Sequence, residues 1–442
     1  MNRMKKYKIF LQGFLVWIGV LGGLWFFLIA TATIPNEWIK KNMLKSTYII
    51  AKEELFAYRE GSKMSGMADN YADSIWLNVA WYMGKEVPVR ASLDTKYYDG
   101  EQNGEKEGLF LAVTEEDRMA NTDYTRYWHG SAGVIRLLHL VTHVNGIRML
   151  GFLITLLFAA IIMIFLIRDG KDLVAVAFFL SMCLVKIWNI RFCMEYQPAF
   201  VLGFLMCILY LMFEKKGDEY LIPLAVTGGT SIAFFDFLTT ETVTIMMPLI
   251  LVVTVRSMEK RVGDFKEGIK IIFAQGMAWG CAYGMTFLAK WLLATIIAGE
   301  NKLNLALAWA GERIAGANTG TGDLSPVLQK LVAPLANFSV LFGANKRLSS
   351  THIIGGIILI LVFGIIVIIC LKLGKKENKG TTLLLSFLGS LILIRFLVLN
   401  NHSYLHAFFT YRALISFFMA IFCIIIVNTN KAMFKKNTGA VD

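Results

Sequence analysis

Long apolar runs separated by short charged clusters dominate this chain. About ten runs approach or exceed the roughly 20 residues that a helix needs to cross a bilayer, near 10–33, 147–167, 173–190, 196–213, 221–238, 241–256, 269–298, 351–371, 382–400 and 411–428. The pattern predicts an all-α polytopic membrane protein of about ten transmembrane helices. The first run is longer than the h-region of a cleaved signal peptide, so we interpret residues 1–33 as an uncleaved N-terminal anchor helix.

Composition and charge support this interpretation. Hydrophobic residues make up 56% of the chain and charged residues only 17%, whereas soluble domains carry about 25% charged residues. A net charge of +12 would suggest nucleic acid if the basic residues formed one patch. They lie instead between the apolar runs, at 168–171, 215–216, 256–270, 372–379 and 431–436. With a cytoplasmic N-terminus, the positive-inside tendency places all of these clusters in the cytoplasm. We therefore expect a multi-pass cell-membrane protein with both termini cytoplasmic and no nucleic-acid partner.

The same alternation divides the chain into domains. A large outer-loop subdomain with surface helices is expected at 34–146, and a second outer loop at 299–350. The transmembrane bundle would comprise residues 147–298 and 351–442. The cytoplasmic loops are too short for a nucleotide-binding domain and contain no Gly-rich phosphate loop. Any chemistry is therefore expected on the outer face.

The outer subdomain contains a candidate catalytic acid. Asp69 and Asp73 are four residues apart, so in a helix their carboxylates share one face. One of them can be a general base or bind a cation; the alternative is a helix N-cap followed by a solvated acid. Residues 94–123 are rich in Asp, Glu, Gly and Asn, and we expect them to be a solvated excursion of low order.

Residues 123–150 combine an aromatic cluster with an apolar helix. Arg136, His139 and His143 recur at intervals of three and four, which predicts one polar stripe along that helix. Such a helix would lie in the headgroup layer and present cations to a phosphate. The alternative is plain interfacial anchoring, without a ligand.

Ionisable residues also recur near the outer ends of the spans. Charge at membrane depth is costly unless it faces a cavity or a partner, so each residue is a functional candidate by default. Intramembrane pairing or snorkelling is the alternative. These residues are Lys186, Arg191, Glu195, Asp236, Glu241, Lys290 and Arg395. In residues 400–412, imidazole, phenol and guanidinium groups suit the binding of a phosphate, although an aromatic belt has a similar composition.

Four short motifs, in the setting of a long first outer loop, carry a resemblance to a known group. DNYAD (69–73), RYWHG (126–130), DFLTTET (236–242) and NHSYLHAFFTYR (401–412) look like motifs of uncharacterised polytopic proteins of bacterial surface-polysaccharide synthesis, and the layout resembles the GT-C superfamily of membrane glycosyltransferases. The resemblance implies a GT-C-like fold and a hexosyl- or pentosyltransferase. Its donor would be a polyprenyl-phosphate-linked sugar, and its acceptor a cell-surface glycan or lipid.

The resemblance also implies roles for single residues. Asp69 best matches the catalytic base, and Asp73 is the second choice. The cations that would hold the lipid phosphate are Arg126, Arg136, His402, His406 and Arg412, and the other substrate-binding candidates are Tyr127, His129, Asp236, Glu241 and Tyr411. We expect membrane lipids as further partners and no cofactor. A second outer loop has no clear acidic pair beyond Asp236 and Glu241, which leaves a divalent cation and the acceptor class open.

Three other functions fit the same layout. A transporter or flippase of a lipid-linked sugar would use the cations without a base. A polysaccharide polymerase or ligase would use a lipid diphosphate donor and a large late outer loop with essential arginines. The loop at 299–350 fits this by its length and contains Lys302, Glu312, Arg313, Lys330 and Lys346. A receptor or assembly scaffold would use the loop at 34–146 for protein contacts. Loss of function on replacing Asp69 separates the transferase from the flippase.

Overall fold

Helices make up 78% of the chain in the computed structural model, which describes residues 3–115, 117–262, 264–315, 321 and 324–429. This agrees with the predicted all-α class. The basic cluster at 431–436 lies outside the described residues. Within them, the strands form two short antiparallel pairs, β1 (Phe56–Tyr58) with β2 (Met67–Asp69), and β3 (Lys96–Tyr97) with β4 (Thr122–Asp123).

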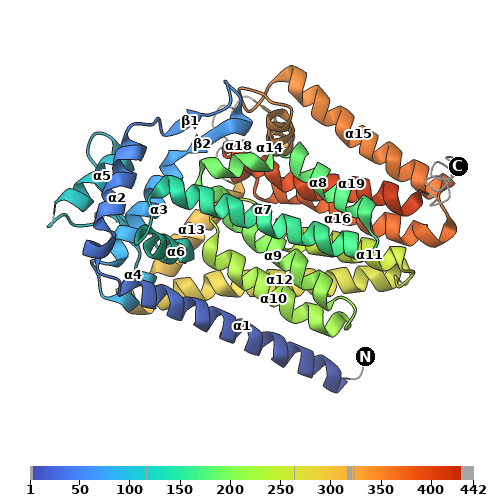
Figure 1. Cartoon of the computed structure of the whole chain (residues 1–442), viewed down its shortest axis with the longest axis horizontal. Helices are drawn as coiled ribbons and strands as arrows, with labels where there is room; N and C mark the ends of the chain where they lie inside the picture. Colours follow the sequence, from blue (N-terminus) through green and yellow to red (C-terminus); the bar gives the residue numbers. More distant parts are fainter. Residues whose placement is uncertain (1–2, 116, 263, 316–320, 322–323, 430–442) are drawn as a thin grey trace, which may run out of the picture.

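Seven helical segments of the described chain are long and apolar enough to cross a membrane. They run roughly side by side along the long axis of the molecule (Figure 1). These segments contain α1 (Arg3–Ala32), α7 (Val144–Arg168), α9 (Pro198–Phe213), α12 (Phe265–Ala298), α15 (Ser350–Leu373), α16 (Lys379–Val398) and α19 (Ile415–Asn428). The chain is thus a polytopic membrane protein by the length and composition of its helices.

The other three predicted spans are helices as well, α8 (Asp172–Leu184), α10 (Asp218–Phe235) and α11 (Val243–Met258). Two of them are short, and the third, α10, has 18 residues and a more polar sequence that begins with Asp218 and Glu219. The 13 residues of α8 rise only about 20 Å, less than the roughly 30 Å of the hydrocarbon core. Helix α11 is buried over most of its surface and packs against α9, α16 and α19, as expected for a helix that is apolar all round.

The predicted outer-loop subdomain is a folded unit at one end of the bundle (Figure 1). The start of α1 and the end of α19 lie at the other end. Besides the strands, the subdomain contains α2 (Asn36–Ala51), α3 (Asn70–Met83), α4 (Pro88–Leu93), α5 (Gly104–Thr114) and α6 (Gly130–His139). Their apolar side chains share one core with the outer part of α1.

Residues 94–123 differ from the solvated excursion that we predicted. They contain β3, α5 and β4, and Leu109, Ala112 and Val113 are buried. The indole of Trp81 in α3 donates a hydrogen bond to the carbonyl of Ala112 at 2.7 Å. The short apolar run 109–113 therefore attaches α5 to α3, despite the polar composition around it.

Two of the three residues of the predicted basic stripe, Arg136 and His139, are buried inside the protein, and His143 is half-buried. Arg136 is fully buried, and its guanidinium donates to the carbonyls of Thr31, Ile34 and Ala80 and to the side chain of Asn36. Arg136 thereby joins the end of α1 to α2 and α3. A polar side chain on an apolar helix needs hydrogen-bond partners. For Arg136 most of these partners are buried backbone carbonyls and not lipid headgroups.

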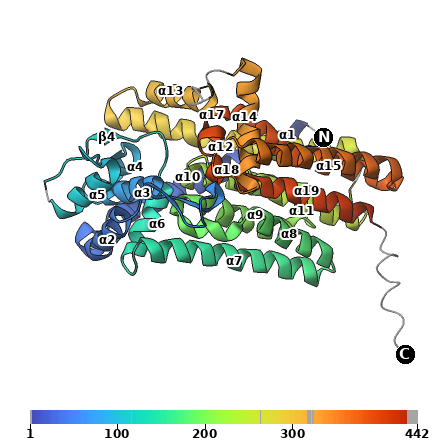
Figure 2. The same cartoon turned by 90° about the horizontal axis from the view of Figure 1, so that it is seen from above.

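The late outer segment consists of two helices, α13 (Lys302–Ala315) and α14 (Pro326–Leu341). Asn337 of α14 donates to the carbonyl of Ser403 at 2.9 Å. Ser403 belongs to α17 (Asn400–Leu405), which is followed by the short α18 (Ala407–Thr410). Seen from above, α13, α14, α17 and α18 lie together beside the subdomain (Figure 2). The contact of Asn337 with Ser403 ties α14 to α17, and the ring of Phe408 packs against that of Phe56 with centroids 5.8 Å apart, which places the 400–412 region next to the first loop.

Candidate functional site

A cavity of about 320 Å³ lies between the outer subdomain and the end of the bundle. Segments far apart in the sequence line it: the β2–α3 junction, residues 124–127, the turn before α9, α13 and α17. Its ionisable side chains are Asp69, Arg126, Glu195, Glu312, Arg313, His402 and His406, together with Tyr71, Tyr124 and Tyr127. Carboxylates, guanidiniums and imidazoles thus converge on one space.

Asp69 lies where a strand becomes a helix. It is the last residue of β2, paired with Phe56 of β1, and its Oδ1 caps α3 by accepting from the amide of Ala72 at 2.8 Å. The N-cap that we considered as an alternative is therefore present, and the carboxyl lines the cavity as well. Burial raises the pKa of Asp69 to about 7, and the nearby Asp73 carboxylate adds to the rise. Near neutral pH this carboxyl can therefore accept and release a proton.

The raised pKa of Asp69 predicts a pH-dependent gain in stability for Asp69→Asn. The unfolded carboxyl ionises near pH 3.8 and the folded one near 7, so its stabilising contribution is lost as the pH rises between these values. Asparagine keeps the cap and carries no charge. The variant should gain on the order of 2–4 kcal/mol over wild type between pH 4 and 8, measured as the difference in thermal midpoint in detergent. Parallel pH profiles for the two proteins would contradict the shifted pKa.

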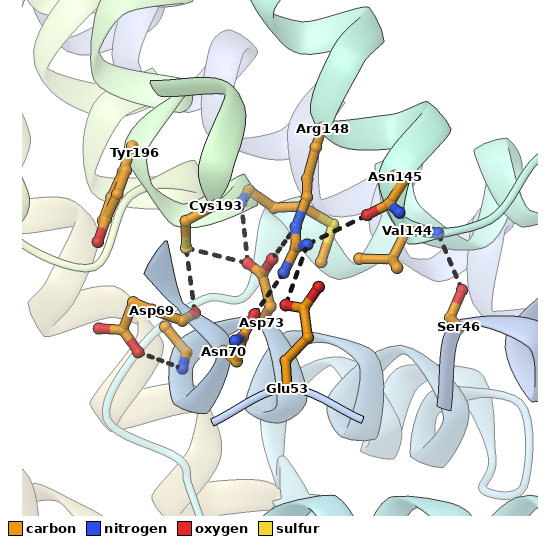
Figure 3. A network of polar contacts seen from close by, with 12 residues as sticks. Ser46, Glu53, Asp69, Asn70, Asp73, Val144, Asn145, Arg148, Cys193 and Tyr196 are labelled. Carbon is orange, nitrogen blue, oxygen red and sulfur yellow. Dashed lines mark hydrogen bonds and ion pairs between the residues drawn. The ribbon is translucent and has the colours of Figure 1, made fainter. Parts of the chain in front are cut away.

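Asp73 lies outside the cavity, in a network of polar contacts (Figure 3). Its Oδ2 pairs with Nε of Arg148 at 2.7 Å. Its Oδ1 accepts from the amide of Met194 at 2.8 Å and from the thiol of Cys193 at 3.1 Å. Arg148 also donates to Asn70 at 2.7 Å. Asp73 therefore ties α3 to α7 and to the turn before α9, and it is not the solvated acid of our alternative interpretation.

Arg126 stands in a box of aromatic rings. Its guanidinium carbon lies 4.5 Å from the ring centroid of Tyr124, 5.3 Å from that of Tyr127 and 4.8 Å from that of Trp309. It also donates to the hydroxyl of Tyr124 at 2.9 Å. Tyr127 is held by a stacking contact with Phe237, with centroids 4.6 Å apart. The rings orient the cation while leaving its Nε without a partner in the described part of the chain.

His402 and His406 also line the cavity. Their ring centroids are 4.7 Å apart, and Nε2 of His406 is 3.4 Å from the guanidinium of Arg313. Burial lowers the pKa of His406 to about 3 and that of His402 well below its ordinary value, with the nearby positive charges adding to both shifts. Both imidazoles are therefore neutral near pH 7. Among the described residues, neither Nδ1 has a hydrogen-bond partner, so each ring can still bind a polar group.

Glu195 is a cavity residue that sequence reasoning marked only as one of several charges near the outer leaflet. It is 6% exposed, and its Oε2 has no partner within the described residues. Trp309, Glu312 and Arg313 reach the cavity from α13. The late outer loop drew attention to Arg313, but no local signal separated it from Lys302 or Lys346.

The remaining acidic candidates support the cavity from outside. Glu241 forms a buried ion pair with Arg395 at 2.9 Å. Asp236 accepts from the amide of Thr239 at 2.8 Å. Together they hold the turn at 236–242, from which Phe237 forms part of the cavity wall. Intramembrane pairing, the alternative that we gave for such charges, describes Glu241 and Arg395.

Four other candidates also lie outside the cavity lining. Arg136 is bound to carbonyls, as described above. Nε2 of His129 contacts the carbonyl oxygen of Tyr124 at 2.7 Å, which fixes the loop that carries Arg126. Arg412 is buried, donates to the carbonyl of Ser65 at 3.1 Å and lies over the ring of Tyr411. The Tyr411 hydroxyl donates to a carbonyl of the bundle. These side chains hold the walls in place.

The ligand side chains near the site decide whether it could hold a metal ion. Among the described residues there is no cluster of three or more His, Cys, Asp or Glu side chains that could hold a metal ion. The donors that converge on the cavity are instead suited to an anion and a proton.

Comparisons with known proteins give no further constraint. Neither protein-family models, nor curated protein sequences, nor solved structures match this chain.

Proposed function

We propose that this protein is a membrane glycosyltransferase that moves a sugar from a polyprenyl-phosphate donor to an acceptor hydroxyl on the outer face of the cell membrane. The observation that carries the proposal is the shared cavity of Asp69, Arg126, His402 and His406. Arg313 adds a second guanidinium. The two guanidiniums and the two imidazole donors suit a lipid phosphate, and the carboxyls of Asp69, Glu195 and Glu312 in the same lining can accept hydrogen bonds from hydroxyl groups.

The proposed reaction gives one role to Asp69, one to the two guanidiniums and one to the two imidazoles. The acceptor oxygen attacks the anomeric carbon while the bond from that carbon to the phosphate oxygen breaks. Asp69 takes the hydroxyl proton. Arg126 and Arg313 stabilise the charge that develops on the departing lipid phosphate, and the imidazoles donate hydrogen bonds to it. The orientation proposed for this reaction counts α8, α10 and α11 as crossings in addition to the seven long segments, which gives about ten. Both termini then lie in the cytoplasm and the cavity faces outward, in a GT-C-like layout.

A labelled donor tests the proposal. The purified protein in detergent is incubated with polyprenyl-phosphate hexoses and pentoses, and the release of free polyprenyl phosphate is measured. We expect release that depends on the protein. Transport of the intact lipid across proteoliposomes without release would identify the flippase instead.

A polymerase or ligase is a second candidate, because Arg313 of the late outer segment reaches the cavity. It differs in its donor, a lipid diphosphate sugar. Supplying both donor classes to the same preparation separates the two, since each releases a different lipid product. Preference for the diphosphate donor would favour the polymerase.

Arg126→Gln should reduce lipid-phosphate release by roughly 10²–10³-fold, because the variant loses a preorganised donor to the developing charge. Glutamine keeps the aliphatic stem and a polar end group but removes the guanidinium that the three rings surround, so the thermal midpoint of the variant is measured alongside its activity to separate loss of folding from loss of the phosphate contact. Arg118→Gln is the matched control, since Arg118 belongs to the same subdomain and does not line the cavity. Equal activity of the two variants would remove Arg126 from the proposed site.

A further inference from the structure

A second cavity of about 150 Å³ lies directly beside the Asp69 cavity. Tyr97 of β3, residues 122–126 and α13 line it, together with Tyr71. All of these residues lie outside the segments that can cross the membrane. This cavity is therefore part of the extramembrane face of the site.

The two cavities share a wall. Tyr71, Tyr124, Arg126 and Trp309 line both of them. The guanidinium of Arg126 thus has one cavity on each side, held there by the rings of Tyr124 and Trp309. A group bound in the second cavity therefore contacts side chains that also line the space beside Asp69.

The lining of the second cavity suits a sugar ring. Three aromatic side chains, Tyr71, Tyr97 and Trp309, offer flat apolar faces, against which the C–H face of a pyranose or furanose can pack. Thr122 and Thr125 add hydroxyls. The Asp123 carboxylate, which Lys302 holds at 2.5 Å, supplies an acceptor of hydrogen bonds. Specific small-molecule sites are usually lined by apolar and aromatic side chains with a few polar groups among them.

A lipid acceptor would need a different surface. An apolar groove of about 700 Å³ runs along α1, α10 and α12, and a smaller apolar cavity of about 250 Å³ lies beside α6, α7 and α9. Neither shares a lining residue with the Asp69 cavity. Of these cavities, the one that adjoins Asp69 is polar, aromatic and outside the spans.

We propose that the second cavity binds the sugar ring of a glycan acceptor, so that the acceptor is a carbohydrate and not a membrane lipid. This inference rests on the proposed glycosyltransferase function. The acceptor hydroxyl would pass the wall at Arg126, attack the anomeric carbon of the donor and lose its proton to Asp69, while polyprenyl phosphate leaves. The donor sugar occupies the first cavity, next to the cations that hold its phosphate.

Filling the second cavity tests the proposal without touching the first. Leu305 lines the second cavity only and is 42% exposed, so Leu305→Trp can add bulk there without breaking the core. Leu307→Trp is the matched control on the same helix, because Leu307 is 53% exposed and lines neither cavity. A panel of methyl hexosides and methyl pentosides is the probe, with binding followed by saturation-transfer NMR in detergent.

We expect at least one glycoside to bind wild type and Leu307→Trp, and its signal to fall at least tenfold in Leu305→Trp. The binding assay needs no donor, so it stands even if the transferase proposal fails. No glycoside bound by wild type, or equal binding by both variants, would overturn the sugar site.

A kinetic measurement distinguishes acceptor from donor. With a polyprenyl-phosphate sugar, Leu305→Trp should raise the KM for the glycoside acceptor at least tenfold and leave donor hydrolysis by water within twofold of wild type. A rise in the KM for the donor would place the donor sugar in the second cavity and overturn the assignment. Absence of lipid-phosphate release in wild type would refute the transferase, whatever the glycosides do.

Discussion

Asp69→Asn is expected to lower lipid-phosphate release by about 10²–10⁴-fold, the usual contribution of a positioned general base. Asparagine has nearly the same shape and still accepts the hydrogen bond from the amide of Ala72 that caps α3. The loss is therefore chemical, and the fold remains. Release of labelled polyprenyl phosphate from the donor, at saturating acceptor, is the measurement.

The controls for Asp69→Asn distinguish the loss of a general base from the loss of one negative charge. Asp117→Asn removes a carboxylate from the exposed surface of the same subdomain and should leave the rate unchanged. Donor binding by Asp69→Asn should also persist, because the cations that hold the phosphate are intact. Retained turnover in the variant would end the assignment of Asp69 as base, and retained transport of the whole lipid would favour the flippase.

Asp73→Leu should destabilise the protein by about 3–5 kcal/mol, because it removes the nearest carboxylate from the buried Arg148 guanidinium and leaves only Glu53, at 3.9 Å, as an acidic partner. The thermal midpoint in detergent should fall by on the order of 5 °C. Arg148→Met should lower the thermal midpoint by a similar amount, because it leaves the Asp73 carboxylate buried without its guanidinium partner. The double variant should recover part of the loss, since an apolar pair of similar volume is often tolerated where a single buried charge is not.

An exposed ion pair is the control for the Asp73–Arg148 pair. Lys215 and Asp169 are 3.2 Å apart and about half exposed, and Asp169→Asn should change the thermal midpoint little. Additive losses in the Asp73→Leu/Arg148→Met double variant would mean that the two side chains are not coupled. Loss of transfer in Asp73→Leu with an unchanged midpoint would instead give Asp73 a chemical role.

Asp69 and Asp73 show which features of the site a local sequence pattern can predict and which it cannot. Their spacing predicted a shared helix face and an N-cap, and Asp69 does cap α3. The choice between them as base needed the partner of Asp73, which is Arg148 in α7, 75 residues further along the chain. Nothing within one turn of α3 indicates that pairing.

The cations illustrate the same limit. Arg126, Arg136 and Arg412 were equal candidates, because each is a basic residue near the outer face. Arg126 faces the cavity, whereas the other two are occupied by backbone carbonyls. Arg313 shared its loop with several other basic residues and was not a favoured candidate, yet it reaches His406.

The amino-acid sequence alone determined that this is a helical membrane protein with a substantial segment between its first two long apolar helices, because bilayer length and hydrophobicity are local properties of a segment. It also determined which residue types are available for chemistry outside the spans. Only the tertiary structure decided which buried polar groups satisfy one another and which face an open cavity. Which groups pair depends on the packing of segments that are far apart in the sequence. Every buried charge needs a partner, and the order of residues along the chain does not indicate which residue that partner is.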